Sequence, residues 1–318
     1  MTHNFTRYAF TLVILIASGL FSINAQTTKQ EDQRVRTVTI PISLFTKEEL
    51  KTGQISEFIE AGFIGVKENG QDSTILSIRT VTSTPIHIAI VIQEDLVGSF
   101  NLQLKEISNF IRTLPADSRV MVAYMRSGSI DVRQRFTTDL DKAAASLRIV
   151  SGSDSFAPRS PYGSVDDVLG KFESLPTGRR AIMLFSDGVD AYDRFDSLFP
   201  TQSPDLERAI LKAQRSGVAV YSFYNEATFT KSGNSRFVNA GQGSLNKLSQ
   251  ETGGKAFFSG SFAPVSYDPF FKELSGMISR QFALTYLSKN MKKGYYRVEV
   301  TSTNPDVKVE HPRGYFYR

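Results

Sequence analysis

Four carboxylates stand just after two strongly apolar runs of the chain, at residues 86–92 and 181–185. They are Glu94, Asp95, Asp187 and Asp190. Apolar runs rich in β-branched residues are typical of strands buried on both faces of a parallel sheet. Such sheets place their ligands at the carboxyl ends of the strands, so we expect the four side chains to gather there. Carboxylate oxygens bind hard cations, and a bound Ca²⁺ is the chemistry that such a group could support.

Few residues of the chain could carry out catalysis. Beyond residue 25 the histidines are His87, inside the run 86–92, and His311, near the end of the chain. The chain therefore offers few histidines for a Ser-His-Asp arrangement, and no Gly-x-Ser-x-Gly sequence follows an expected strand. A dinucleotide site would need glycines where residues 93–97 read Gln-Glu-Asp-Leu-Val. We expect a non-catalytic protein, and a hydrolase with an unrecognised site is the weakest alternative.

Composition excludes several classes of protein. The chain has 318 residues, of which 41% are hydrophobic and 22% charged, as in an ordinary globular protein. It contains no cysteine, so it is neither a disulfide scaffold nor a lipoprotein acylated on cysteine. The net charge is +5, but the basic residues are scattered and lack flanking aromatics for stacking. Nucleic-acid binding is not expected, and zinc is disfavoured by the absence of cysteine and the two distant histidines.

The first 25 residues have the features of a secretory signal peptide. Arg7 precedes the apolar stretch 8–17, and small residues lead to Ala25, after which we expect cleavage. A membrane anchor is the weaker interpretation, because the apolar stretch is interrupted and shorter than about 20 residues. We expect a soluble protein that is secreted or periplasmic and has no stable membrane span after cleavage.

From residue 86 the pattern alternates between apolar runs and amphipathic stretches. We expect strands at 86–92, 120–125, 130–136, 181–185, 218–224 and 255–258. Helices are expected at 104–114, 139–149 (with Thr138 as its cap), 165–175, 204–216, around 245–248 and at 269–279. This order predicts an α/β fold, a doubly wound and mostly parallel sheet with helices on both faces.

Both ends of the mature chain are rich in expected strands. They lie at 35–44, 63–66, 74–80, 282–287, 295–302 and 307–310, with Asn69-Gly70 as a hairpin turn. The predicted organisation is a signal peptide at 1–25, an N-terminal β-rich segment at 26–84, an α/β domain at 85–280, and C-terminal strands at 281–318. We expect the last segment to pack with the first β-rich one in a small β-module.

The succession of these segments resembles the von Willebrand factor A (VWA) fold. The resemblance rests on residues 86–92, 118–124, 136–139, 178–190, 213–221 and 248–254. More narrowly, the chain is similar to the bacterial secreted "VWFA-related" family of Acidobacteria type. In that family a β-rich segment precedes the domain, and a strand pair ending in Arg-Gly-Tyr follows it, here Arg313-Gly-Tyr315. The resemblance covers residues 35–318.

The resemblance implies a divalent-cation site held by an Asp-x-Ser-x-Ser loop, a threonine and a second aspartate. Carried over residue by residue, Gln93 replaces the first Asp, Asp95 the first Ser, Val97 the second Ser, and Gly163 the Thr. Ser164 could substitute for that threonine, and Asp187 is kept. The amide at position 93 and the isopropyl group at position 97 remove two of about five protein oxygen ligands. Mg²⁺ tolerates an incomplete octahedral coordination shell badly. We therefore expect a degenerate site and no cofactor.

The metal candidates, should Mg²⁺ or Ca²⁺ bind after all, are Asp95, Asp187, Glu94 and Ser164, and the expected ligand-binding rim is Gln93, Asp190 and Gly163. The resemblance thus implies a secreted VWA-like module for protein binding, adhesion or scaffolding, whose protein partner the sequence does not identify. The alternative is a metal-dependent ligand binder with a rebuilt site.

Overall fold

The computed structural model describes residues 34–46, 63–81, 84–127, 129–158, 160–176, 178–190, 203–231 and 235–317. The chain divides into two units, Met1–Arg34 and Val35–Arg318, and every element described below belongs to the second. The signal peptide predicted for residues 1–25 lies outside the described residues. None of the described helices is both long enough and apolar enough to cross a membrane.

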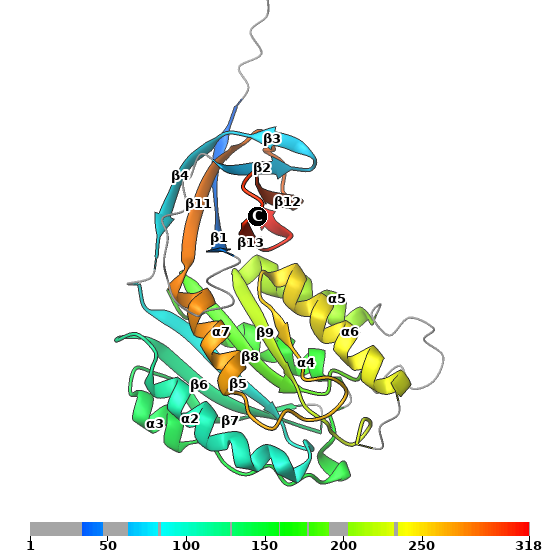
Figure 1. Cartoon of the computed structure of the whole chain (residues 1–318). Coiled ribbons are helices and arrows are strands. Elements are labelled where there is room, and N and C mark those ends of the chain that lie inside the picture. Colours follow the sequence, from blue (N-terminus) through cyan, green and yellow to red (C-terminus); the bar gives the residue numbers. More distant parts are fainter. Residues whose placement is uncertain are drawn as a thin grey trace, which may run out of the picture. The chain divides into compact units, whose positions relative to one another are not determined.

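Within the described part of the chain, the central sheet has six strands in the order β10-β9-β8-β5-β6-β7 (Figure 1). Their bounds are β5 Ile86–Gln93, β6 Arg119–Arg126, β7 Ser129–Thr137, β8 Arg179–Ser186, β9 Val218–Tyr224 and β10 Ala256–Phe257. All neighbours are parallel except β7, which pairs antiparallel with β6 at one edge. The prediction of a doubly wound, mostly parallel sheet is confirmed.

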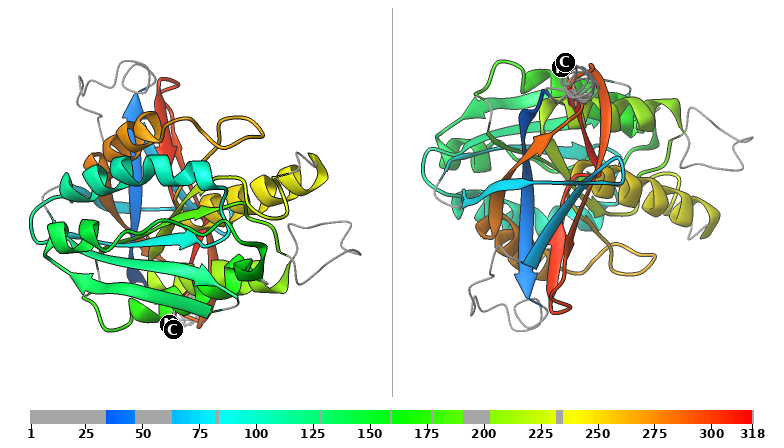
Figure 2. Two further views of the ribbon diagram at one scale, coloured as in Figure 1. Left: turned by 90° about the horizontal axis from the view of Figure 1, so that it is seen from below. Right: turned by 90° about the horizontal axis from the view of Figure 1, so that it is seen from above.

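Helices cover both faces of this sheet (Figures 1 and 2). The two sets are α2 Leu104–Arg112, α3 Leu140–Ala145 and α7 Asp268–Ser279 on one face, and α4 Pro161–Lys171, α5 Pro204–Ser216 and α6 Ser235–Thr252 on the other. Alternate residues of β5 point to opposite faces, so Ile88, Ile90 and Ile92 pack with the first set and Ala89 and Val91 with the second.

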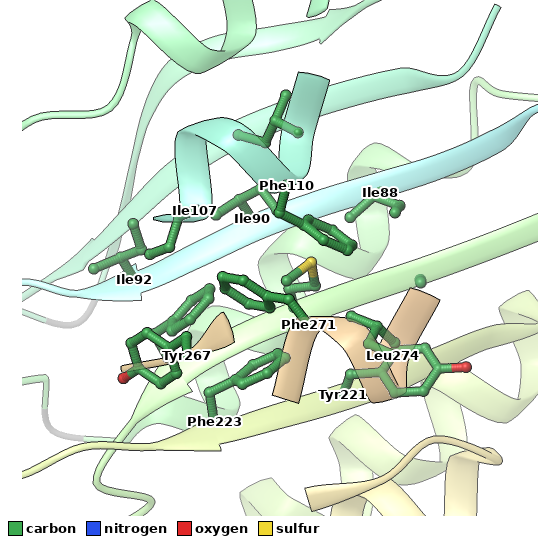
Figure 3. Close-up of a cluster of buried hydrophobic side chains, with 14 of the residues drawn as sticks. Ile88, Ile90, Ile92, Ile107, Phe110, Tyr221, Phe223, Tyr267, Phe271 and Leu274 are labelled. Carbon is green, nitrogen blue, oxygen red and sulfur yellow. The ribbon is translucent and has the colours of Figure 1, made fainter. Parts of the chain in front are cut away.

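The core on the α2 and α7 face is rich in aromatic rings (Figure 3). Phe185 stacks on Phe223 with ring centroids 4.8 Å apart, and Tyr267 meets Phe185 edge-on at 5.2 Å. Phe271 from α7 contacts the same group. Because these rings come from β8, β9 and the segment around α7, they fix the ends of the sheet against that helix.

Local signals set some helix ends, and others differ from the sequence expectation. Helix α6, Ser235–Thr252, is much longer than the short helix expected around 245–248, and α3 ends at Ala145, before the expected residue 149. The side chain of Ser203 caps α5, and Gly217 at φ 61° ends it, as the Ser-Pro and Gly positions predicted. The cap of α3 is Asp139, which accepts from Lys142 N at 2.9 Å, rather than the expected Thr138. Helix α4 begins at Pro161, four residues before the expected start at Val165, because proline suits the first helical position.

Strands from the two ends of the chain pair with one another. Eight further described strands form two four-stranded sheets, β13-β1-β11-β4 and β14-β12-β2-β3. Their bounds are β1 Arg36–Thr46, β2 Ile64–Glu68, β3 Gln71–Ser73, β4 Ile75–Thr80, β11 Gln281–Ser288, β12 Gly294–Ser302, β13 Val307–Glu310 and β14 Gly314–Tyr317. β1 and β2 pair antiparallel with β11 and β12, and the two sheets share one apolar core. Asn69 and Gly70 form the β2–β3 turn with positive φ, as the sequence predicted.

A buried carboxylate ties these two sheets together. Glu68 accepts hydrogen bonds from Tyr286 Oη at 2.8 Å, Ser288 Oγ at 2.7 Å and Tyr315 Oη at 3.1 Å. Although burial raises the pKa of Glu68, the hydrogen bonds from Ser288, Asn290 and the two tyrosines bring it below its usual value. Glu68 therefore stays ionised, and its donors come from strands of both sheets.

Candidate functional site

Two side chains at adjacent strand ends form the centre of the candidate site. Gln93 ends β5, and Asp187 follows directly after β8, the parallel neighbour of β5. Gln93 Nε2 donates to Asp187 Oδ1 at 3.2 Å, and Gln93 Oε1 accepts from Ser186 Oγ at 2.5 Å and from Asp187 N at 3.3 Å. Gln93 is 1% exposed and Asp187 0%. A neutral amide therefore engages the carboxylate in a site closed to solvent.

The turn after Asp187 is held tightly against α6. Asp187 Oδ1 also accepts from Val189 N at 3.1 Å, and Ser186 Oγ accepts from Gly188 N at 2.9 Å. Gly188 has φ 71°, and a Cβ there would lie 2.5 Å from Gly241 O. Only glycine fits both the backbone conformation and the space. This turn therefore fixes the orientation of the Asp187 carboxylate.

Three oxygens of the site have no hydrogen-bond partner in the described part of the chain. They are Asp187 Oδ2, Asp95 Oδ1 and Ser164 Oγ, and all are buried. The other oxygen of Asp95 accepts from Thr228 N at 3.2 Å. Burial, and then the nearby charge of Asp95, raises the pKa of Asp187 from 3.8 to about 7. Asp187 is therefore substantially protonated near neutral pH.

Glu94 forms an ion pair with Arg148 of the same chain. Arg148 Nη1 donates to Glu94 Oε1 at 2.9 Å and Arg148 Nη2 to Glu94 Oε2 at 2.7 Å, a bidentate pair. The guanidinium also lies 4.2 Å from the centroid of the Tyr124 ring. Both carboxylate oxygens of Glu94 are therefore bound to Arg148. The sequence had grouped Glu94 with Asp187 and had not indicated that Arg148 lies beside it.

The expected rim residues surround the Asp187 turn in different ways. Asp190 Oδ2 accepts from Ser160 Oγ at 3.1 Å and from Ser203 Oγ at 2.5 Å, which joins the starts of α4 and α5. Gly163 lies in the first turn of α4 with open space where a Cβ would be. Tyr162 donates from its hydroxyl to Gly188 O at 2.7 Å, a contact that no sequence pattern indicated.

The donor set falls short of a Mg²⁺ site. Gln93 turns an N–H toward Asp187, and an N–H cannot coordinate a cation. The remaining free donors are Asp187 Oδ2, Asp95 Oδ1 and Ser164 Oγ, three of the six ligands that Mg²⁺ requires. Among the described residues, no three His, Cys, Asp or Glu side chains are grouped so that they could hold a metal ion. Water ligands would have to enter a site in which Asp95 is 2% exposed and Asp187 0% exposed.

The histidines lie away from these acids. His87 is near the start of β5, at the opposite end of the strand from Gln93, in register with Arg119 and Arg180. Burial and then these two cations lower its pKa. His311 Nε2 accepts from Val300 N at 3.2 Å, so it serves a backbone group in the β-module. Neither histidine is paired with a serine or an acid in the described residues.

Four exposed apolar side chains lie in segments that hydrogen bonds join to one another: Leu102 in the 3₁₀ helix Gly98–Gln103, Ile149 beside Val150, and Phe262 and Val265 beside Pro264. We name Leu102, Ile149, Phe262 and Val265 the apolar loop surface; they are 81, 69, 65 and 95% exposed. Asn101 exchanges hydrogen bonds with the backbone of Val150, and Gln103 Nε2 donates to Pro264 O at 2.9 Å. Sequence reasoning missed this group, because isolated apolar residues in loops carry no periodic signal.

The central sheet with its helices has the doubly wound α/β arrangement that the sequence resemblance implied. No protein-family model matches the sequence, and no similar sequence is found among the curated proteins compared with it. Similar solved structures include an aerotolerance-related membrane protein from Bacteroides fragilis (12% identity, TM-score 0.42, 61% of this chain and 98% of that chain). Conserved hypothetical protein BatB from Bacteroides thetaiotaomicron has the same identity and TM-score over 61% and 97%. A von Willebrand factor type A structure from Catenulispora acidiphila shows 10% identity and a TM-score of 0.42 over 82% and 75%.

Proposed function

We propose that this chain is an exported, non-catalytic protein-binding module that acts without a metal ion. The observation that carries the proposal is the closed pair of Gln93 and Asp187. The VWA resemblance implies a bound cation whose coordination shell is completed by an acidic side chain of the partner. Here the amide of Gln93 makes the contact to Asp187 from inside the protein, so no open coordination position faces a partner.

The apolar loop surface supports a protein as the binding partner. Single exposed apolar residues are ordinary, but hydrogen bonds join the segments that carry these four, and we propose that they act together as one interaction surface. Val265, at 95% exposed, leaves nearly its whole side chain in water. We propose that an apolar segment of the partner covers these residues, and that the hydrogen bonds of Asn101 and Gln103 hold the loops ready for it.

Export is part of the proposal and rests on the sequence of residues 1–25, which has the arrangement of a signal peptide. A protein without cysteine needs no disulfide chemistry to fold outside the cytoplasm. An adhesion or scaffold role in the periplasm or outside the cell is consistent with both features. N-terminal sequencing of the mature protein from its native host tests this part: a start at Gln26 is expected, and a retained Met1 would contradict it.

Site-specific photo-crosslinking tests the binding surface. A benzophenone side chain at position 265 is expected to crosslink a protein partner in the presence of EDTA, and Leu102→Asp is expected to remove that product. The same probe at Leu76, an exposed leucine of the β-module, is the matched control. Equal products from both positions, or a product at 265 that requires Mg²⁺, would contradict the proposal.

A second candidate function, metal-dependent ligand binding, is favoured by one observation. Asp187 Oδ2, Asp95 Oδ1 and Ser164 Oγ are buried without partners, and buried polar atoms are usually satisfied. These atoms would hold the cation, which would supply an electrophilic centre for an acidic ligand. The raised pKa of Asp187 offers the other resolution, because a proton on Asp187 removes its repulsion with Asp95. Metal titration of the native protein separates the two candidates.

A further inference from the structure

A surface hollow lies at the opposite end of α5 from the Asp187 site. It has a volume of about 420 Å³ and is lined by Arg215, Lys293, Gly294, Phe316 and Tyr317. Ser203, which contacts Asp190, caps the start of α5, and Arg215 is in its last turn. Twelve residues of helix separate the two positions, about 18 Å along the axis. The hollow is therefore distinct from the candidate site already described.

The lining of the hollow carries two positive charges and no carboxylate. The ion pairs formed in the part of the chain that the structure describes involve neither Arg215 nor Lys293. Both side chains are exposed. A cation pair without a balancing acid attracts anions, and a guanidinium binds carboxylate or phosphate in a bidentate way.

The aromatic residues of the hollow are held in place by cations. The Arg215 guanidinium lies 4.2 Å from the ring centroid of Phe316, and that of Arg36 lies 3.9 Å from the ring centroid of Tyr317. Phe316 also contacts Tyr295 with centroids 6.0 Å apart. These contacts fix the rings and the Arg215 charge before any ligand arrives, which reduces the entropy lost on binding.

We propose that this hollow binds a small organic anion, a carboxylate or phosphate attached to an apolar ring. The anionic group would contact Arg215 and Lys293, and the ring would lie against Phe316. The volume falls within the range of about 300–1,000 Å³ that small-molecule sites occupy. The combination of charge and aromatic surface selects for both parts of such a ligand, since inorganic phosphate lacks the ring and a neutral aromatic lacks the charge.

Titration of the full chain with phenyl phosphate, followed by calorimetry, tests this proposal, with inorganic phosphate and benzyl alcohol as the comparison probes. We expect saturable binding of phenyl phosphate and at least about tenfold weaker binding of each comparison probe. Arg215→Gln and Lys293→Gln should each weaken phenyl phosphate binding about tenfold or more. Arg208→Gln, on the same helix and ion-paired with Asp205, is the matched control and should bind like the native chain.

Circular dichroism of each variant checks that the fold is kept, and Lys293→Gln provides a second test if the loss of the Phe316 contact unfolds Arg215→Gln. Three results would overturn the proposal: no binding of phenyl phosphate at millimolar concentration, inorganic phosphate bound as tightly as phenyl phosphate, or an affinity unchanged in the folded variants. Because the hollow lies apart from Asp187, none of these results bears on the metal-independent proposal.

Discussion

Gln93 Nε2 donates a hydrogen bond to Asp187 Oδ1 across 3.2 Å, between the ends of two neighbouring parallel strands. The same amide accepts from Ser186 Oγ and from the backbone of Asp187, so it is bonded through both of its polar atoms. By donating to the carboxylate and accepting from its neighbours, this side chain links the ends of the two strands. The properties of the site therefore depend on an amide at position 93.

Replacing that amide by a carboxylate of the same shape should destabilise the protein strongly. Gln93→Glu places a third buried acid beside Asp187 and Asp95, and we expect a loss of about 3–5 kcal/mol in the free energy of unfolding at pH 8. The loss should be smaller at pH 5, where a buried glutamate is protonated. Urea unfolding at both pH values measures it, with exposed Gln71→Glu as the control. Equal stability of Gln93→Glu and the native chain at pH 8 would contradict this account.

The raised pKa of Asp187 makes stability fall as pH rises. Between its unfolded value of 3.8 and its folded value of about 7, the folded protein keeps a proton that the unfolded chain releases. This contribution to stability is complete below about pH 4 and is lost by about pH 7. Asp187→Asn removes the titration, so over this range the variant should gain up to about 4 kcal/mol relative to the native chain. A stability difference that is constant with pH would show that Asp187 titrates normally.

The turn that orients Asp187 should accept no side chain at position 188. Gly188→Ala forces an unfavourable φ and brings Cβ to 2.5 Å from Gly241 O, and we expect a loss of about 3 kcal/mol or more. Gly276→Ala, in α7 with open space around its Cβ, should be neutral or stabilising by up to about 1 kcal/mol. Thermal unfolding of the two variants gives the comparison. Similar melting temperatures for both would argue against a rigid turn.

The apolar loop surface should matter for binding and not for folding. Leu102→Asp and Val265→Asp are expected to change the free energy of unfolding by no more than about 0.5 kcal/mol, because both side chains already face water. Binding of the crosslinked partner should be lost in both and kept in Leu76→Asp. A large loss of stability would mean that these side chains pack within the protein, and retained binding would place the interface elsewhere.

The fold could be predicted from the sequence because its strands are buried on both faces. The apolar run at 86–92 became β5, and the Ser-Pro and Gly signals marked both ends of α5. Helix α4 was expected to begin at Val165, since the polar residues around Pro161 resemble a loop. It begins at Pro161, because contacts such as that of Tyr162 with Gly188 O stabilise the extra turn. Tertiary contacts of this kind leave no local pattern.

The candidate site was predictable only in part. Parallel strands put Gln93 and Asp187 side by side, and the sequence placed both at the strand ends. The pairing of Glu94 with Arg148 was not predictable, because 54 residues separate them and nothing in their spacing links the two loops. For the same reason the sequence counted Glu94 among the metal candidates, whereas both of its oxygens are bound to a guanidinium.

Calorimetric titration of the EDTA-treated protein with Mg²⁺, Mn²⁺ and Ca²⁺ at pH 7.5, with melting temperatures recorded in parallel, shows whether the Gln93–Asp187 site binds a metal ion. The amide of Gln93 occupies the contact that a cation would make, so we expect no saturable heat and no change in melting temperature with any of the three ions. Micromolar binding that disappears in Asp187→Ala would contradict the metal-independent proposal and establish the unpartnered oxygens of Asp95 and Asp187 as cation ligands.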